Sequence, residues 1–332
     1  YRSPTLSDRS KRANYSWIGF LVGRGRVQIT DPMPAASDWD FEDRVVLVTG
    51  GSRGLGRAFA KCFARHGARV VINSLGSDDE LEPGLSGAEV TRREIESEGG
   101  SALICDGPAT AADQLIDFCI SSFGRLDVVV HCAGIVRDRS FGKLTAEDWE
   151  AVYDVHLRAA YKLSHAAWPL FKAQGYGRLL FVSSSSGLYG SFGQANYGAM
   201  KLGLLGLAKT LAVEGEAGNI HCNCVAPVAA TRMNARVLDD SMRQRLDVQD
   251  IAPLVAYLCH EQCTENGSLF EAAGGWFGKV RFQRSIGAVL PAGNFNIADV
   301  ASHWDEINDF SGAEAPATPL ESLEMIMERI SS

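Results

Sequence analysis

A strand, a glycine-rich turn and a helix follow one another without a break near the start of the regular part of the chain. Val45–Thr49 is a short apolar run rich in β-branched residues, which is typical of a buried strand. The turn after it has the sequence T-G-G-S-R-G-L-G, and a helix is expected to continue to about His66. With these flanks the glycine pattern predicts a dinucleotide site, because the helix N-terminus faces a pyrophosphate. The plainer interpretation is a left-handed turn that only precedes a helix.

This turn is expected to supply most of the cofactor contacts. Gly50 and Gly54 allow a tight turn and a close approach of the backbone, and Gly56 lets the helix pack on the strand. The predicted cofactor-binding residues of the segment are Gly50, Ser52, Arg53, Gly54, Leu55 and Gly56.

The choice of nucleotide depends on the end of the second strand, Val70–Asn73. It is followed by Ser74, where a site that prefers NAD usually carries an acid for the ribose hydroxyls. Arg53 lies inside the glycine turn, where a guanidinium group reaches a 2′-phosphate. Both features favour NADP. NAD is the alternative, because the acidic run at residues 78–80 could return a carboxylate to the ribose.

Strand and helix patterns alternate along the rest of this region. Further strands are expected at residues 102–105, 128–131, 177–183, 220–226 and 269–273, and helices at 88–98, 111–123, 146–173, 194–216 and 251–259. This alternation, with right-handed crossovers, predicts an α/β fold with a Rossmann-like, doubly wound parallel sheet. We assign residues 41–275 to this dinucleotide-binding catalytic domain and residues 276–332 to a C-terminal extension.

The two ends of the chain differ from the alternating region. Residues 1–30 carry six basic side chains and one acidic one, which predicts a basic N-terminal arm over residues 1–40. The arm is either the remainder of an organellar targeting segment or a flexible tail. In the extension, Leu320, Leu323 and Met327 have helical spacing, as does Ile330. They predict an amphipathic helix whose apolar face packs on the domain or on a partner.

The stretch from Ser184 to Lys201 carries the residues best suited to catalysis. Ser184 follows the buried strand pattern Leu179–Val182, so it belongs at the carboxyl end of a parallel strand, where open α/β sheets bind their ligands. Tyr197 and Lys201 are four residues apart and share one face of the expected helix. A lysine ammonium beside a phenol is expected to lower the phenol pKa and make it a usable general acid or base. We therefore expect Ser184 to polarise a carbonyl, Tyr197 to move a proton and Lys201 to tune it.

Other strand ends add candidates for cofactor binding. Asp106 is placed either to bond an adenine amine or to cap the next helix. The small pair Ala133-Gly134 lets the backbone approach the cofactor. Pro227 ends a later strand, and residues 228–248 are expected to form a mobile, partly helical flap over the site.

Composition argues against several other classes of protein. The net charge of −8 disfavours nucleic acid as a partner, because nucleic acid needs a basic face. No apolar run approaches the roughly eighteen residues that span a bilayer. Several of the eight cysteines fall in expected strands and helices, as small buried residues of a reducing compartment do. None has the paired C-x-x-C spacing of a structural zinc site, so no metal is expected.

Taken together, these motifs resemble the short-chain dehydrogenases/reductases. The matching features are the T-G-x-x-x-G-x-G turn, Ala133-Gly134, Ser184 and Tyr197-x-x-x-Lys201. From about Phe41 to the C-terminus, the chain is also similar to the (3R)-hydroxyacyl-CoA dehydrogenase units of peroxisomal multifunctional enzymes of type 2. This narrower resemblance rests on segments such as G-I-V-R-D-R-S-F from Gly134 and Y-G-S-F-G-Q-A-N-Y from Tyr189.

The resemblance implies a role for each catalytic candidate. Tyr197 would be the proton donor and acceptor at the substrate oxygen, and Ser184 would hold that oxygen. Lys201 would lower the tyrosine pKa and bind the nicotinamide ribose. His156 stands where many members have an asparagine that holds a relay water, and the type 2 enzymes resemble this chain in having histidine there. Apart from the resemblance, a histidine in the middle of a helix is more often a packed or capping residue.

The chain also departs from the family pattern. Ser74 replaces the acid of the NAD-using relatives. His131-Cys132 replaces the usual Asn-Asn, so the hydrogen bonding at that strand end must differ. The hydratase and sterol-carrier-like domains of the multifunctional enzymes do not follow in this sequence, and a stand-alone dehydrogenase is therefore expected.

The predicted function is the interconversion of 3-hydroxyacyl-CoA and 3-ketoacyl-CoA by hydride transfer with a nicotinamide cofactor. Arg137, Arg139 and Lys143 either meet the CoA phosphates or are solvated loop charges. The alternatives are a steroid or other secondary-alcohol dehydrogenase, and an accessory or structural subunit of a larger organellar assembly. The expected partners are an acyl-CoA or other carbonyl substrate and further copies of the chain in a homo-oligomer. The expected location is the mitochondrial matrix or the peroxisome.

Overall fold

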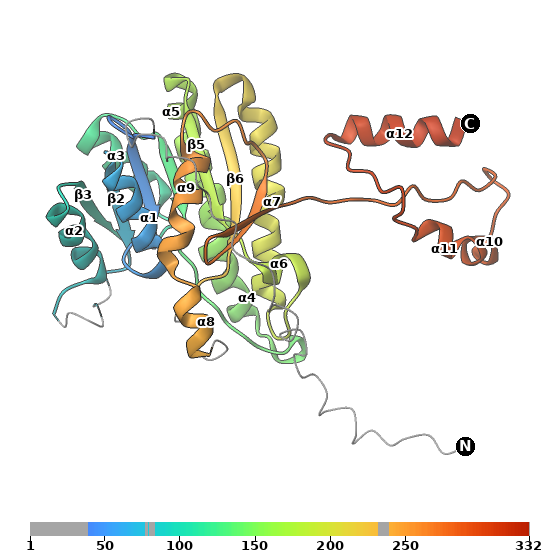
Figure 1. Ribbon diagram of the computed structural model, residues 1–332, viewed down its shortest axis with the longest axis horizontal. Coiled ribbons are helices and arrows are strands. Elements are labelled where there is room, and N and C mark those ends of the chain that lie inside the picture. The colour runs from blue at the N-terminus through green and yellow to red at the C-terminus, as the bar shows by residue number, and fades with distance from the viewer. Residues whose placement is uncertain (1–38, 77–78, 80–83, 232–238, 332) are drawn as a thin grey trace, which may run out of the picture. The chain divides into compact units, whose positions relative to one another are not determined.

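The computed structural model describes residues 39–76, 79, 84–231 and 239–331. Within these residues, eight strands form one sheet in the order β3-β2-β1-β4-β5-β6-β7-β8 (Figure 1). The strands are β1 (Val45–Thr49), β2 (Arg69–Ser74), β3 (Ser101–Asp106), β4 (Val128–His131), β5 (Gly177–Val182), β6 (Ile220–Pro227), β7 (Leu269–Ala273) and β8 (Trp276–Val280). Strands β1 to β7 pair in parallel, so their carboxyl ends share one edge. The Rossmann-like, doubly wound sheet is confirmed.

Helices cover both faces of the sheet. The helices that the structure describes, on the sheet, in the loops and in the C-terminal extension, are α1 (Gly54–Arg65), α2 (Gly87–Ser97), α3 (Ala112–Phe123), α4 (Ala146–Tyr153), α5 (Ala159–Gln174), α6 (Ser185–Tyr189), α7 (Ala195–Gly215), α8 (Asp240–Arg245), α9 (Ala252–Cys259), α10 (Ile297–Ser302), α11 (Trp304–Ile307) and α12 (Pro319–Ser331). Val46 and Val48 of β1 share a buried cluster with α1, α2 and α9, whereas Val45 and Leu47 share one with α3, α5 and α7. Because strand side chains alternate between faces and both faces are covered, the strands are continuous apolar runs.

The last strand of the sheet corrects the sequence prediction. β8 runs antiparallel to β7, with Ala273 opposite Trp276. Gly274 and Gly275 form the two-residue turn between them, with φ of +50° and +82°. Two positive φ values suit the tight hairpin turns that match strand twist, and glycine adopts them without strain. The sheet is therefore mostly rather than wholly parallel, and the boundary placed at residue 275 cuts through a hairpin.

The helix expected over residues 146–173 is interrupted in the middle. Between α4 and α5, residues Asp154–Arg158 form a single π-turn, η4. The backbone N–H of Ala159 there donates to the carbonyl of Asp154, five residues back. Turns of this kind are rare and occur often at functional sites. This one contains His156.

The C-terminal extension has polar contacts of its own. Glu314 forms ion pairs with Arg284 and Arg329, and the backbones of Arg284 and Glu314 exchange two hydrogen bonds of 2.9 Å. The amphipathic helix expected near the C-terminus is present as α12. Its packing on the domain or on a partner stays a prediction.

Some expectations fall outside the described residues. One of them is the basic arm predicted for residues 1–40, of which residues 1–38 are not described. Residues 232–238 of the predicted flap are another, while the rest of that flap contains α8 and the 3₁₀-helix η6 (Val248–Ile251) and is partly helical as expected. None of the helices that the structure describes has the length and apolarity to cross a membrane. Within the same residues, no cluster of three histidine, cysteine or acidic side chains is arranged to hold a metal ion.

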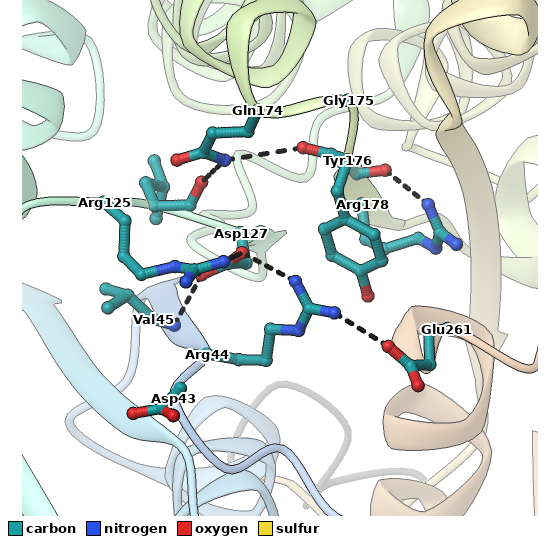
Figure 2. A network of polar contacts seen from close by, with 12 residues as sticks. Asp43, Arg44, Val45, Arg125, Asp127, Gln174, Gly175, Tyr176, Arg178 and Glu261 are labelled. Carbon is teal, nitrogen blue, oxygen red and sulfur yellow. Dashed lines mark hydrogen bonds and ion pairs between the residues drawn. The ribbon is translucent and has the colours of Figure 1, made fainter.

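A network of polar contacts joins the amino ends of β1 and β4, at the edge opposite the glycine turn (Figure 2). Asp127 is fully buried and accepts hydrogen bonds from Arg44 (3.2 Å), Arg125 (2.7 Å) and the backbone N–H of Val45 (2.9 Å). Arg44 also donates to Glu261 (2.8 Å) at the surface. Asp127 is thus the common acceptor that fixes this edge of the sheet.

We expect Asp127→Ala to lower the free energy of unfolding by about 2–4 kcal/mol, because it leaves two arginines and a buried N–H without their acceptor. Urea denaturation followed by circular dichroism measures this loss. The matched control is Glu261→Ala, which removes a carboxylate that is 60% exposed and should cost less than about 1 kcal/mol. Equal losses for the two variants would contradict the central place of Asp127.

Candidate active site

The predicted site residues gather along the carboxyl edge of the sheet. Thr49, at the end of β1, is the register partner of His131 at the end of β4. Ser74 on β2 lies beside Asp106 on β3. Ser184 lies two residues after the end of β5. Segments far apart in the sequence therefore meet at one edge because the strands are parallel and in register.

The glycine turn packs against the strand end after β4. Gly50 has φ of +67°, and a Cβ added to it would lie 2.8 Å from Ala133 Cα. A Cβ on Gly56 would lie 2.2 Å from the Gly50 carbonyl oxygen. The hydroxyl of Thr49 accepts the N–H groups of Cys132 and Ala133, each at 3.2 Å. The tight turn and close packing predicted for Gly50 and Gly56 are thus present.

The start of α1 fits a phosphate group. Its N-cap residue, Arg53, has extended backbone and contributes no side-chain cap. The N–H groups of the first helical turn are therefore left for a ligand acceptor. A Cβ at Gly54 would meet nothing within 4 Å, so the turn leaves space there. These features agree with a dinucleotide whose phosphates lie at this helix terminus.

The loop after β2 returns one acid toward the glycine turn, but an arginine pairs with it. Asp79 forms an ion pair with Arg57, and its side chain is only 7% exposed. Arg57 also donates to the Ser52 carbonyl at 2.7 Å. The hydroxyl of Ser74 accepts the N–H of Gly76 at 3.3 Å. Asp79, one of the three acids that could favour NAD, is thus engaged by Arg57, which no local pattern in the sequence marks. Asp78 and Glu80 lie outside the described residues.

Asp106 does not cap a helix. The helix that follows it, α3, has Ala111 as its N-cap, so that interpretation of Asp106 is wrong. Its carboxylate instead faces the loop after β2, where a Cβ added to Gly76 would lie 3.8 Å from it. The adenine contact stays a prediction, as does any cofactor contact of Pro227 or Leu55.

The structure places Ser184 near enough to Tyr197 for its hydroxyl to affect the phenol pKa. Ser184 also caps α6, its hydroxyl accepting the N–H of Ser186 at 3.2 Å. Burial raises the pKa of Tyr197, and the nearby Ser184 hydroxyl opposes this rise. This rise in the Tyr197 pKa is opposite to the fall expected from a neighbouring lysine. Removal of the phenol from water outweighs the other influences on its pKa.

Lys201 lies one helical turn after Tyr197 on the same face of α7, as the four-residue spacing predicts. Its ammonium nitrogen is 5.4 Å from the centroid of the Tyr197 ring and donates to the carbonyl of Val182. Burial lowers the pKa of Lys201 to about 8. A buried lysine with such a pKa is in position to exchange a proton near neutral pH.

His156 lies against Tyr197 from the π-turn. The two rings are perpendicular, with centroids 5.2 Å apart. Its Nε2 is 2.8 Å from the carbonyl oxygen and 3.1 Å from the nitrogen of Ile135. Its Nδ1 is buried and has no hydrogen-bond partner among the described residues. Burial and the charge of Lys201 hold the pKa of His156 well below its usual range, so the ring is neutral.

Asn196 is a site residue that the sequence pattern did not reveal. It is fully buried directly before Tyr197, and its Oδ1 accepts the Tyr197 N–H at 2.8 Å. Its amide nitrogen donates to the carbonyls of Arg137 (3.3 Å) and Asp148 (3.2 Å). Asn196 thus ties the start of α7 to α4 and to the loop after Gly134. An asparagine beside a tyrosine gives no local signal of such contacts.

The basic residues proposed for CoA phosphates lie in that loop. Arg139 forms an ion pair with Asp148 at 3.3 Å, and Arg137 approaches the same carboxylate at 4.0 Å. Their side chains are more than half exposed, and Lys143 is exposed as well. Their binding of a phosphate stays a prediction.

We expect Gly50→Ala to weaken NADPH and NADH binding by about tenfold or more, since an alanine at positive φ is strained and its Cβ meets the backbone of Ala133. Fluorescence titration of the purified chain measures both affinities. Gly206→Ala in α7 is the matched control, because a Cβ there meets nothing within 4 Å. Unchanged affinity in Gly50→Ala would show that the turn does not hold the nucleotide.

Comparison with known proteins agrees with this geometry. Residues 44–241 match the family model described as short chain dehydrogenase. Peroxisomal multifunctional enzyme type 2 of Mus musculus is 47% identical, over 88% of this chain and 40% of that protein. A short-chain type dehydrogenase/reductase of Mycobacterium tuberculosis is 44% identical, over 82% of this chain and 96% of that protein. The structure of full-length peroxisomal multifunctional enzyme type 2 from Drosophila melanogaster is similar with a TM-score of 0.76 and 37% identity, over 88% of this chain and 50% of that chain.

The relatives differ in how much of their own length this chain covers. The chain spans 40% of the length of the mouse enzyme, whereas it covers nearly the whole of the mycobacterial protein. The family model covers more than half of the chain and includes the glycine turn, Ser184, Tyr197 and Lys201. The chain therefore belongs to the short-chain dehydrogenase/reductase family, whose members are oxidoreductases that use a nicotinamide cofactor.

Proposed function

We propose that this oxidoreductase interconverts 3-hydroxyacyl-CoA and 3-ketoacyl-CoA. The observation that carries the proposal is the grouping of Tyr197 with Lys201 and His156 at the sheet edge that also holds the glycine turn. The acyl-CoA substrate is supported by the similarity to the multifunctional enzymes, since relatives in fungi are named peroxisomal hydratase-dehydrogenase-epimerase. The names of these relatives also favour the peroxisome over the mitochondrial matrix.

In this proposal each site residue handles one part of the reaction. The nicotinamide, when bound, supplies or accepts the hydride. Ser184 holds the substrate oxygen by a hydrogen bond, and Tyr197 gives a proton to that oxygen during reduction or takes it during oxidation. Lys201 returns a proton to Tyr197 and favours the phenolate by its charge. His156 holds Tyr197 in place through ring contact and offers Nδ1 to a relay water.

We also propose that the cofactor is NADP. Arg53 is exposed at the N-cap of α1, and Ser74 stands in place of an acid at the end of β2, the strand that pairs with β1. Asp79, the described acid of the loop after β2, is paired with Arg57. A phosphate on the adenosine ribose would thus meet a guanidinium group and no free carboxylate from Asp79.

Tyr197→Phe should reduce turnover of acetoacetyl-CoA by about 10²–10⁴-fold, because the ring remains but the transferable proton is lost. NADPH binding should stay within about threefold of the wild-type value, since the phenol is not needed to hold the nucleotide. Absorbance at the nicotinamide band and fluorescence titration measure the two quantities. Near-normal turnover would rule out Tyr197 as the proton carrier.

Arg53→Ala should raise the Kd for NADPH by about 10–100-fold and leave the Kd for NADH within about threefold, because one charged hydrogen bond to the 2′-phosphate is lost. The control is Arg93→Ala, which removes an exposed arginine paired with Glu89 on α2. Titration with both nucleotides gives the comparison. An equal loss of affinity for NADPH and NADH would mean that Arg53 does not read the phosphate.

A further inference from the structure

The π-turn between α4 and α5 leaves one backbone carbonyl without its helical partner. In a regular α-helix, the N–H of Ala159 would donate to the carbonyl of Val155. Here that N–H donates to Asp154 instead. A carbonyl that is partly shielded from water and lacks a donor costs free energy, so a hydrogen-bond donor from outside the helix would stabilise the π-turn.

His131 supplies that donor. Its Nε2 lies 3.1 Å from the carbonyl oxygen of Val155 and 3.0 Å from that of His156. Its side chain is buried, and it comes from the end of β4, twenty-five residues before His156 in the chain. One imidazole N–H therefore reaches two carbonyl oxygens of the π-turn.

The contacts of Thr49 determine which nitrogen of His131 carries the proton. The Thr49 hydroxyl already accepts the N–H groups of Cys132 and Ala133, so its own proton is free to go to His131 Nδ1, 2.9 Å away. Nδ1 is then the acceptor, and Nε2 carries the hydrogen that faces the π-turn. Burial and the charge of Lys201 lower the pKa of His131 to about 4, which agrees with a neutral ring.

The π-turn in turn sets the place of His156. It directs this side chain toward Gly134, where an added Cβ would lie 2.6 Å from His156 Cε1. It also lays the ring of His156 perpendicular to that of Tyr197. A relaxation of the turn to regular α-helix would rotate His156 about the helix axis and remove both contacts.

We propose that His131 is a positioning residue that sustains the π-turn and thereby holds His156 against Tyr197. The proposal rests on the function proposed above for Tyr197. It gives a physical reason for histidine at this strand end: the ring spans the gap between the β1 hydroxyl of Thr49 and the helix carbonyls. His131 acts through the backbone of the π-turn and through His156, and it does not contact the substrate itself.

Two variants separate the hydrogen bond from the volume of the ring. His131→Phe keeps a ring and removes the donor, whereas His131→Gln keeps an N–H donor at similar reach. We expect His131→Phe to accelerate amide hydrogen exchange of the segment 154–160 by about tenfold or more, measured by mass spectrometry. We expect it to lower kcat by about 10–100-fold, with KM for NADPH within about threefold. His131→Gln should restore both quantities to within about fivefold of wild type. If His131→Phe does not fold, His131→Met, flexible and without a donor, replaces it.

The matched control is His260→Phe. His260 is also buried, and its Nε2 contacts a backbone carbonyl, that of Asp40, at 3.1 Å near the amino end of β1. It should lower stability without changing exchange in the segment 154–160 or kcat. Unchanged exchange in the segment 154–160 of His131→Phe, or an acceleration spread evenly over the whole domain, would overturn the proposal. The exchange measurement stands even if no acyl-CoA is turned over, so failure of the proposed function and failure of this inference are distinguishable.

Discussion

The hydroxyl of Thr49 is the contact on which the rest of the site depends. It binds the backbone of Cys132 and Ala133 and faces His131, so it joins the end of β1 to the end of β4. The glycine turn that starts at the next residue therefore cannot move without the strand end that it packs against. Each of these groups is buried or nearly so, and an unmatched buried polar group costs about 1–3 kcal/mol. The geometry of the nucleotide edge is thus fixed by one side-chain oxygen.

The two edges of the sheet use polar groups in different ways. The amino edge holds opposite charges together, with Asp127 as the acceptor for two arginines. The carboxyl edge holds neutral groups, because burial lowers the pKa of both His131 and His156. Lys201 is the exception, with a pKa of about 8. A lysine beside two neutral imidazoles suits proton exchange with Tyr197, since neither imidazole competes for its proton.

Much of the fold was predictable because it follows from local patterns. The apolar run before the glycine turn, the four-residue spacing of Tyr197 and Lys201 and the strand before Ser184 each specify structure within a few residues. What could not be predicted depends on contacts between distant segments. The π-turn around His156 needs a donor from His131, and the carboxylate of Asp79 is paired with Arg57, 22 residues away. The rise in the Tyr197 pKa depends on burial, which spacing on a helix does not reveal.

The error at the end of the sheet was of another kind. The Gly274-Gly275 pair and the residues after it carry the signal of a tight hairpin, yet a parallel α/β pattern gives no reason to expect one. The structure shows why the extra strand is useful. β8 becomes the last strand of the sheet, and Lys279 near its end is ion-paired with Glu265 at 2.6 Å. The ring of Trp276 lies over Gly278, where a Cβ would be 2.6 Å from it. A charged side chain on an edge strand disfavours strand addition by another molecule, so Lys279 makes the β8 edge a poorer template than an uncharged strand would be.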